Sequence, residues 1–380
     1  MSGPHWLSDE HLGVAATLAH VDEIIGALGA ILFEYQTAAS GVVQLREVLD
    51  GASRHLVVNA VNPIPEKVPL LAADALNALR AALEHTIYVE AVAHAGGELD
   101  ESAAKLVEMP AAETYDQFTE WTRKRAKNGP AALRDGAQLH RRIYDLQPLH
   151  RYADPPAHPL ARLVDYTNHA KHRTPAVTAV RIPVVSREDL PPMRLRDLPK
   201  RPEEPIKPGQ VVFTAPADQV IPVVLFPTIG INVPGTERWP VLMKELGEIA
   251  TWVRKQAIPR LITGLNAPEP EIPAWYDIST GHTDPRSAMA SGTALSAFDR
   301  SSNRLQAAAV RVEMVETIAA MPDAPSRADV LAWLDSLPDS EVLERMRELL
   351  PSLDHDPDVM AHNWGVLQRM RDDAVAFSRP

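Results

Sequence analysis

Arg80 and His85 are the residues of this sequence whose types and spacing could do chemistry. They lie five positions apart in the segment 70–93, which reads LLAADALNALRAALEHTIYVEAVA. A histidine transfers protons near neutral pH, and a guanidinium binds a phosphate through two parallel hydrogen bonds. Metal-free RNA cleavage requires such a pair, one group to move a proton and one to stabilise the charged phosphate. The alternative is that Arg80 forms an ion pair with Glu84, four residues further on.

The segment that carries this pair is predicted to be a helix that starts at Pro69 and ends near Gly96 and Gly97. Its apolar residues recur at steps of three and four and form one narrow stripe, at Leu76, Leu79, Leu83 and Ile87. His85 projects almost opposite this stripe, on a face of alanines (Ala78, Ala81, Ala82), so we expect a second element or a second copy to cover it. Arg80 and His85 are about 140° apart around the helix, and a symmetric dimer is the arrangement that brings such pairs into one cleft.

The segment from Arg123 to Arg173 is basic, whereas the whole chain has a net charge of −12. It contains eleven Lys and Arg against four Asp and Glu, and five of the fourteen His. A solvated basic face is one interpretation, and a local footprint for RNA or phosphate is the other. Lys171 and Arg173 have a further interpretation as caps of a helix end. The candidate RNA- and phosphate-binding residues are Arg123, Lys124, Arg125, Lys127, Arg141, Arg142, Asn168, Lys171, His172 and Arg173.

Two segments of the chain resemble a known family. AADALNALRAALEH (72–85) is similar to the GD-x-x-x-NLRSALDH signature of a widespread bacterial and phage family related to the HEPN superfamily. DLQPLHRYADPPAHPLARLVDYTNHAKHR (145–173) is similar to that family's LQPY…PL..L..LDN.DKHR block. The resemblance covers about residues 9–265 and departs at Ala81, usually polar in active members, and at Ala170, often Asp.

The resemblance implies a helical bundle with a small sheet, and a dimeric ribonuclease that needs no metal. The R-x4–6-H motif of HEPN ribonucleases falls on Arg80 and His85, which would be the catalytic residues. Arg162 and His169 also fit the spacing and remain an alternative pair. Many HEPN-like proteins are not catalytic, so a binding module or a sensor of a nucleotide ligand is the alternative function.

The predicted fold class is mainly α (α+β). Residues 1–265 are predicted as a HEPN-like helical domain, with a small antiparallel β-sheet inserted at about 176–226, where Val- and Ile-rich runs occur. A short strand near 56–62 is expected to join this sheet. Further helices are predicted at 131–147, with Arg141 and Arg142 facing outward, and at 238–263.

Residues 266–293 are rich in Pro, Gly, Ser and Ala and are predicted to be a linker. Residues 294–380 are predicted to be an acidic helical extension, a candidate surface for a protein partner. One of its helices is expected to begin at Ser326, which has Asp329 three residues later.

Composition excludes several kinds of site. The chain has no Cys, so it holds no disulfide, no thiolate zinc site and no Cys nucleophile. The best metal candidates, His169 with His172 and the run Asp354–Asp356, match no established ligand pattern, and we expect no metal and no cofactor. No P-loop, dinucleotide fingerprint or GxSxG motif occurs.

The N-terminus and the apolar segments indicate the compartment. The first residues, MSGPHWLSDEH, lack a basic region followed by an apolar run, and no apolar stretch is judged long enough to span a membrane. We therefore expect a cytoplasmic protein without a membrane partner. The leading hypothesis is a metal-independent endoribonuclease in a toxin or antiphage-defence role. An enzyme needs His85 accessible in a cleft beside Arg80, whereas a scaffold can bury both.

Overall fold

The computed structural model describes residues 4–187, 201–219, 222–264, 268–351 and 356–378. Contacts divide the chain into two units, Met1–Phe298 and Asp299–Pro380. The chain is mainly helical with small antiparallel sheets, which confirms the predicted mainly α (α+β) class.

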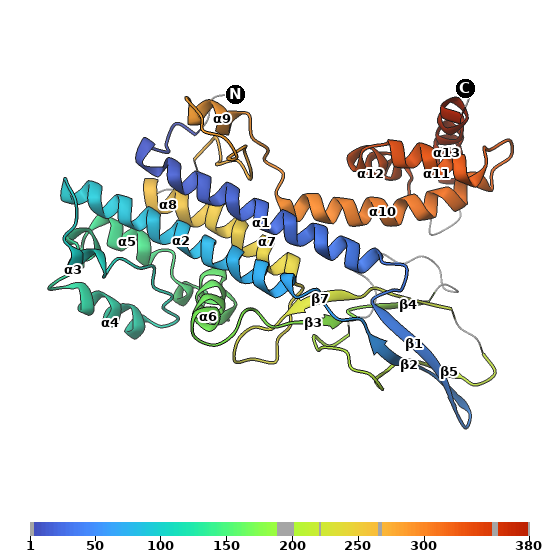
Figure 1. The fold of residues 1–380 in the computed structure, drawn as a ribbon, viewed down its shortest axis with the longest axis horizontal. Coiled ribbons are helices and arrows are strands. Elements are labelled where there is room, and N and C mark those ends of the chain that lie inside the picture. The colour runs from blue at the N-terminus through green and yellow to red at the C-terminus, as the bar shows by residue number, and fades with distance from the viewer. Residues whose placement is uncertain (1–3, 188–200, 220–221, 265–267, 352–355, 379–380) are drawn as a thin grey trace. The chain divides into compact units, whose positions relative to one another are not determined.

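The core of the first unit is built on helix α2, Lys67–Ala95. The predicted apolar stripe is buried, with Leu76, Leu79, Leu83 and Ile87 all at most 2% exposed. Helices α1 (Leu12–Thr37) and α7 (Leu242–Trp252) run beside α2 in Figure 1 and contact it. The helix ends at Gly96, whose positive φ of 71° forms the left-handed cap that glycine favours.

The alanine face of α2 is covered more fully than the stripe alone predicts. Ala82 was expected beside His85 on the far face, but it is completely buried. The reason is that α2 is a central helix, with α1, α6, α7 and α8 packed around it. Burial therefore extends well beyond one narrow stripe.

Helix α1, with the 3-10 turn Asp9–His11 before it, corrects one expectation. Within the described ranges, Asp9–Thr37 is the segment long and apolar enough to cross a membrane by length and composition. The expectation that no stretch reaches this length was wrong. Leu18, Ile25 and Leu28 of this segment are buried in the core against α2. A core helix meets the same criteria, so the segment alone does not indicate a membrane.

Short antiparallel strands form three small sheets within the described part of the chain. The largest has the order β1-β2-β5, from Val43–Asp50, Ser53–Val61 and Val211–Pro216. The other two pair β3 with β7 and β4 with β6, from Thr178–Arg181 with Thr228–Ile231 and Val185–Arg187 with Val223–Leu225. Strands at 176–226 and near 56–62 were predicted, but as one sheet. Strand β1 was missed because its sequence, VQLREVLD, has no buried residue and hence no strong apolar pattern.

The helices that lie between α2 and β3 in the sequence include the basic segment. They are α3 (Glu101–Ala104), α4 (Tyr115–Arg125), α5 (Gln138–Tyr144) and α6 (Pro159–His172). A capping box between Thr114 and Gln117 begins α4. A single helix was predicted at 131–147, but the left-handed Gly136 (φ 83°) separates a 3-10 turn, Ala131–Leu133, from α5.

The predicted helix at 238–263 is interrupted. It consists of α7, a π-helical turn Val253–Ala257 and α8, Ile258–Thr263. Pro259 follows the turn. Proline removes a backbone donor and clashes with the carbonyl four residues earlier, and a local π-turn accommodates both effects.

Residues 268–293 belong to the first unit and are not a linker. They contain helix α9, Pro285–Ala290, and Ile272, Tyr276 and Met289 lie in the main core. Trp6 Nε1 donates to Pro270 O at 2.9 Å, and Arg286 donates to Asp9 at 2.7 Å. The Pro- and Gly-rich composition therefore marks irregular but packed chain.

The second unit contains helices where the extension was predicted to be helical. They are α11 (Arg327–Ser336), α12 (Asp339–Glu348), α13 (Pro357–Ser378) and most of α10 (Ala297–Ala319). Their own core contains Trp333, Leu334 and Met370. The predicted start of a helix at Ser326 is confirmed, because its side chain accepts from Asp329 N at 3.2 Å.

Helix α6 begins at a histidine that must stay neutral. His158 Nδ1 accepts from Leu160 N at 3.1 Å, and its ring meets Trp252 edge-on at 5.1 Å. Burial, with Arg151 and Arg162 nearby, lowers the pKa of His158 to about 4. Protonation of Nδ1 would remove the acceptor that caps the helix.

We therefore expect His158 to make stability fall in acid. Its folded pKa is below its ordinary value, so the unfolded chain takes up the proton first. The stabilisation is complete above about pH 6.5 and is lost towards pH 4, by about 2 kcal/mol for a partly exposed ring. Urea unfolding at pH 7 and pH 4.5 measures this loss. His158→Asn caps the helix without titrating, so its stability should depend less on pH, and equal slopes for both proteins would contradict the assignment.

Candidate active site on helices α2 and α6

The two sequence motifs meet through Arg80. Its Nη1 donates to Asn168 Oδ1 at 2.7 Å and to Thr167 Oγ1 at 2.9 Å, both on α6. The arginine side chain is only 13% exposed. Residues 88 positions apart in the sequence therefore form one hydrogen-bonded group.

The structure also contains the ion pair between Arg80 and Glu84 that the sequence suggested as the alternative to a catalytic role. Arg80 Nε donates to Glu84 Oε1 at 3.0 Å. No hydrogen bond from Nη2 is formed to any residue in the described part of the chain. Nη2 is thus the nitrogen of Arg80 that has no hydrogen-bond partner among the described residues.

His85 is exposed on α2. The alanine face predicted that a second element or a second copy covers His85, and no second element in the described part of this chain does so. Its position, five residues after Arg80, separates the two side chains along and around the helix. The cavity of about 430 Å³ described below is lined by neither residue. His85 thus has the accessibility that an enzyme needs, and Arg80 is held in packing, as in a scaffold.

The last turn of α6 presents polar groups beside Arg80. Asn168, Lys171, His172 and Arg173 are all exposed. Among the residues with described positions, no side-chain hydrogen bond links Lys171 or Arg173 to the last carbonyls of the helix. Both side chains are therefore exposed and do not cap the helix, although the backbone N–H of Arg173 donates to His169 O at 2.9 Å.

In the alternative pair, Arg162 and His169, the arginine is buried and forms ion pairs within the protein. Arg162 Nη1 pairs with Glu245, and its Nη2 lies 3.2 Å from Glu248 Oε2. Tyr166 Oη donates to Glu245 Oε1 at 3.2 Å. Burial raises the pKa of Glu245, against the lowering effect of Arg162. Two carboxylates therefore pair with the Arg162 guanidinium, whereas one, Glu84, pairs with Arg80.

The remaining basic candidates divide by burial. Arg123, Lys124, Lys127 and Arg141 are exposed, and Lys124 pairs with Glu120 at 3.1 Å. Arg125 is 3% exposed: it donates to Leu106 O, Trp121 O and Glu108 and stacks 4.2 Å above the Trp121 ring. This guanidinium stabilises the packing of α4 and is not available to RNA.

Arg142 corrects a second expectation. It was predicted to face outward with Arg141, but it donates to Leu261 O and Ile262 O, both at 2.8 Å. It also lies 3.3 Å from Glu90. A guanidinium at the carbonyl end of a helix satisfies unpaired acceptors and the helix dipole, so Arg142 caps α8.

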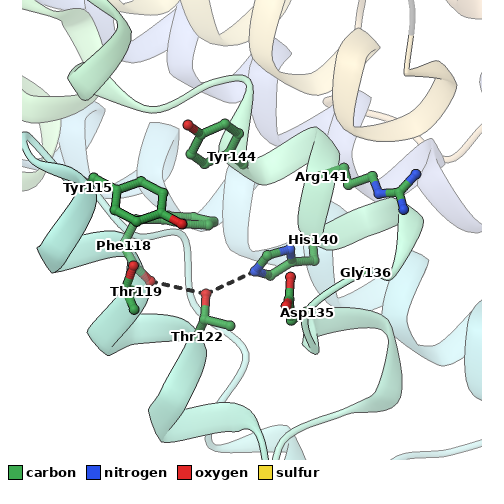
Figure 2. Close-up of a pocket in the computed structure, with 9 residues that line it drawn as sticks. All are labelled: Tyr115, Phe118, Thr119, Thr122, Asp135, Gly136, His140, Arg141 and Tyr144. Atoms are coloured by element: carbon green, nitrogen blue, oxygen red, sulfur yellow. Dashed lines mark hydrogen bonds between the residues drawn. The ribbon is translucent and has the colours of Figure 1, made fainter.

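A cavity between α4 and α5 was missed by sequence reasoning. It has a volume of about 430 Å³. Figure 2 shows aromatic rings on one side of it and polar groups on the other. Its residues recur at helical spacing, which is the signal that could have revealed it. They are Tyr115, Phe118, Thr119 and Thr122 on α4, His140, Arg141 and Tyr144 on α5, and Asp135 and Gly136 before α5.

Metal ligands are sparse in the described ranges. Those residues contain no group of three or more His, Cys, Asp or Glu placed to hold a metal ion. Of the acidic run considered as a metal candidate, Asp354 and His355 lie outside the described residues.

Comparisons of the chain with protein-family models, with curated proteins and with solved structures find no match.

Proposed function

We propose that the chain is a metal-independent endoribonuclease of the HEPN type, active as a homodimer in the cytoplasm in a toxin or antiphage-defence role. The observation that carries the proposal is the 2.7 Å hydrogen bond from Arg80 to Asn168. It joins the two segments that resemble the family into one polar site.

Each group of this site has a role that its position supports. Arg80 is oriented by Glu84, Thr167 and Asn168, and its Nη2 binds the scissile phosphate. His85 is exposed and transfers the proton. The exposed side chains of Lys171, His172 and Arg173 bind the RNA backbone and position it without reading its sequence.

The helix geometry supports the proposed dimer. Arg80 and His85 project about 140° apart, so one chain presents them in different directions. In the proposed dimer the two-fold axis lies beside α2, so that His85 of one copy approaches Arg80 of its partner. The complete site then contains one residue from each copy, and the dimer has two such sites.

Cleavage of labelled tRNA and mRNA in EDTA tests this proposal. We expect wild-type protein to cut RNA, and Arg80→Ala and His85→Ala each to be inactive. An equal mixture of the two variants should recover about a quarter of the wild-type activity, because half of the dimers then contain one intact site. Mixing without recovery contradicts the shared site, and a wild-type protein inactive in EDTA and in Mg²⁺ contradicts the ribonuclease.

A second candidate function is a non-catalytic sensor of a nucleotide ligand. The observation that favours it is the cavity between α4 and α5, which combines aromatic rings with hydrogen-bonding groups. Stabilisation of the protein by a nucleotide, without cleavage of any RNA, would distinguish the sensor from the enzyme.

The second unit is the proposed surface for a protein partner. Its helix α13 exposes Met360 and Trp364, which are four residues apart and therefore neighbours on one face. Large apolar side chains that gather on an exposed helix face are typical of protein-binding surfaces.

A further inference from the structure

One side of the cavity between α4 and α5 is lined by aromatic residues, and these residues differ in how tightly their rings are packed. Phe118 lies inside a cluster, with ring centroids 5.4 Å from Trp121, 5.2 Å from His140 and 5.1 Å from Tyr144. Tyr115 is 66% exposed and has no ring contact with the other residues whose positions are described. A face of Tyr115 is therefore free to stack on a flat ligand.

The opposite side of the cavity fixes which hydrogen-bonding groups a ligand needs. Thr122 Oγ1 donates its single proton to Phe118 O at 3.0 Å, so at 2.9 Å from His140 it accepts from Nε2–H. Burial lowers the pKa of His140, which favours the neutral ring. The second nitrogen, Nδ1, is then an acceptor, and no described residue donates to it.

Asp135 adds a second acceptor, and Arg141 adds a cation. Figure 2 places the Asp135 carboxylate beside the His140 ring, while the Arg141 side chain extends away from the aromatic residues. Both are exposed residues at the opening of the cavity. The complementary ligand is therefore flat, carries N–H donors on its ring and bears a negative group outside the cavity.

We propose that this cavity binds an unpaired nucleobase with an exocyclic amine, as part of a nucleotide or a single-stranded RNA. The base stacks on Tyr115, and its amine donates to Asp135 or to the imidazole of His140. The phosphate lies at the opening, near Arg141. A volume of about 430 Å³ is within the range of small-ligand sites, roughly 300–1,000 Å³. The inference is independent of the ribonuclease proposal, because it concerns binding alone.

Titration calorimetry of the full chain tests the site with AMP, CMP and UMP, the single strands A6 and C6, and ribose 5-phosphate. We expect AMP and CMP to bind, and UMP more weakly, because its base has a carbonyl where cytosine has the amine. Tyr115→Ala should weaken binding about 10- to 100-fold, the range that base stacking supplies. Tyr152→Ala is the matched control, since this tyrosine is 88% exposed and outside the cavity.

The outcomes separate the two sources of the base. Equal affinities for AMP and A6 assign the site to a free nucleotide. Binding of A6 or C6 without binding of AMP or CMP assigns the site to RNA. In both cases Tyr115→Ala must weaken the binding. Unchanged affinity in Tyr115→Ala overturns the proposal. It is also overturned if ribose 5-phosphate binds as tightly as AMP, or if neither nucleotides nor single strands bind. Thermal unfolding of Tyr115→Ala verifies that the variant is folded.

Discussion

Replacing His85 with alanine is expected to lower the rate of RNA cleavage by about 10²- to 10⁴-fold, the contribution of a general acid or base. The alanine variant has no group at this position that can transfer the proton. Because His85 is exposed, its removal breaks no packing, and the free energy of unfolding should change by less than about 0.5 kcal/mol. Single-turnover cleavage rates and urea unfolding measure the two quantities separately.

The matched control for this variant is His94→Ala. His94 is exposed in the last turn of the same helix, so its replacement removes an equivalent imidazole away from the proposed site. It should cleave RNA at the wild-type rate. The assignment of His85 fails if His85→Ala retains full activity, and a similar loss in both variants indicates a general effect on RNA binding.

Replacing Arg162 with alanine is expected to destabilise the first unit by about 3–5 kcal/mol, the cost of breaking a buried ion pair. The variant leaves Glu245, whose side chain is 2% exposed, without its main counter-charge. Glu245 then either takes up a proton or remains charged in a poorly solvated site, and both cost free energy. Urea unfolding at pH 7 measures the difference.

Two further variants locate the cause of this loss. Arg173→Ala removes an exposed arginine just after the same helix and should change stability by less than about 0.5 kcal/mol. Arg162→Met combined with Glu245→Leu removes both charges and should recover much of the stability. A folded Arg162→Ala protein with wild-type stability and no ribonuclease activity would reverse the assignment and favour the Arg162–His169 pair.

The sequence by itself determined the central helix and its limits. Periodic leucines mark the buried side of α2, and Pro69 is compatible with its first turn. The left-handed Gly96 ends it. The cap at Ser326 was likewise readable, because a cap depends on residues within one turn. These features are local, so a short window of sequence contains their physical cause.

The sequence could not separate functional from structural arginines. Arg123 and Arg125 are two residues apart and look alike in a basic run, yet one is exposed and the other lies against Trp121. Arg141 and Arg142 are adjacent, and only Arg142 reaches the end of α8. The two carbonyls that Arg142 caps are more than one hundred residues away, so no local pattern could indicate them.

Only the tertiary structure decided which groups share a site. The packing of α6 against α2 brings Asn168 to Arg80, and the packing of α4 against α5 brings Thr122 to His140. The tertiary structure also shows that the segment 268–293, predicted to be a linker, contributes residues to the core. Helix periodicity and helix caps depend on residues that are neighbours in the chain, so they can be predicted from the sequence. Burial and side-chain partners depend instead on contacts between distant segments, which form only when the whole unit folds.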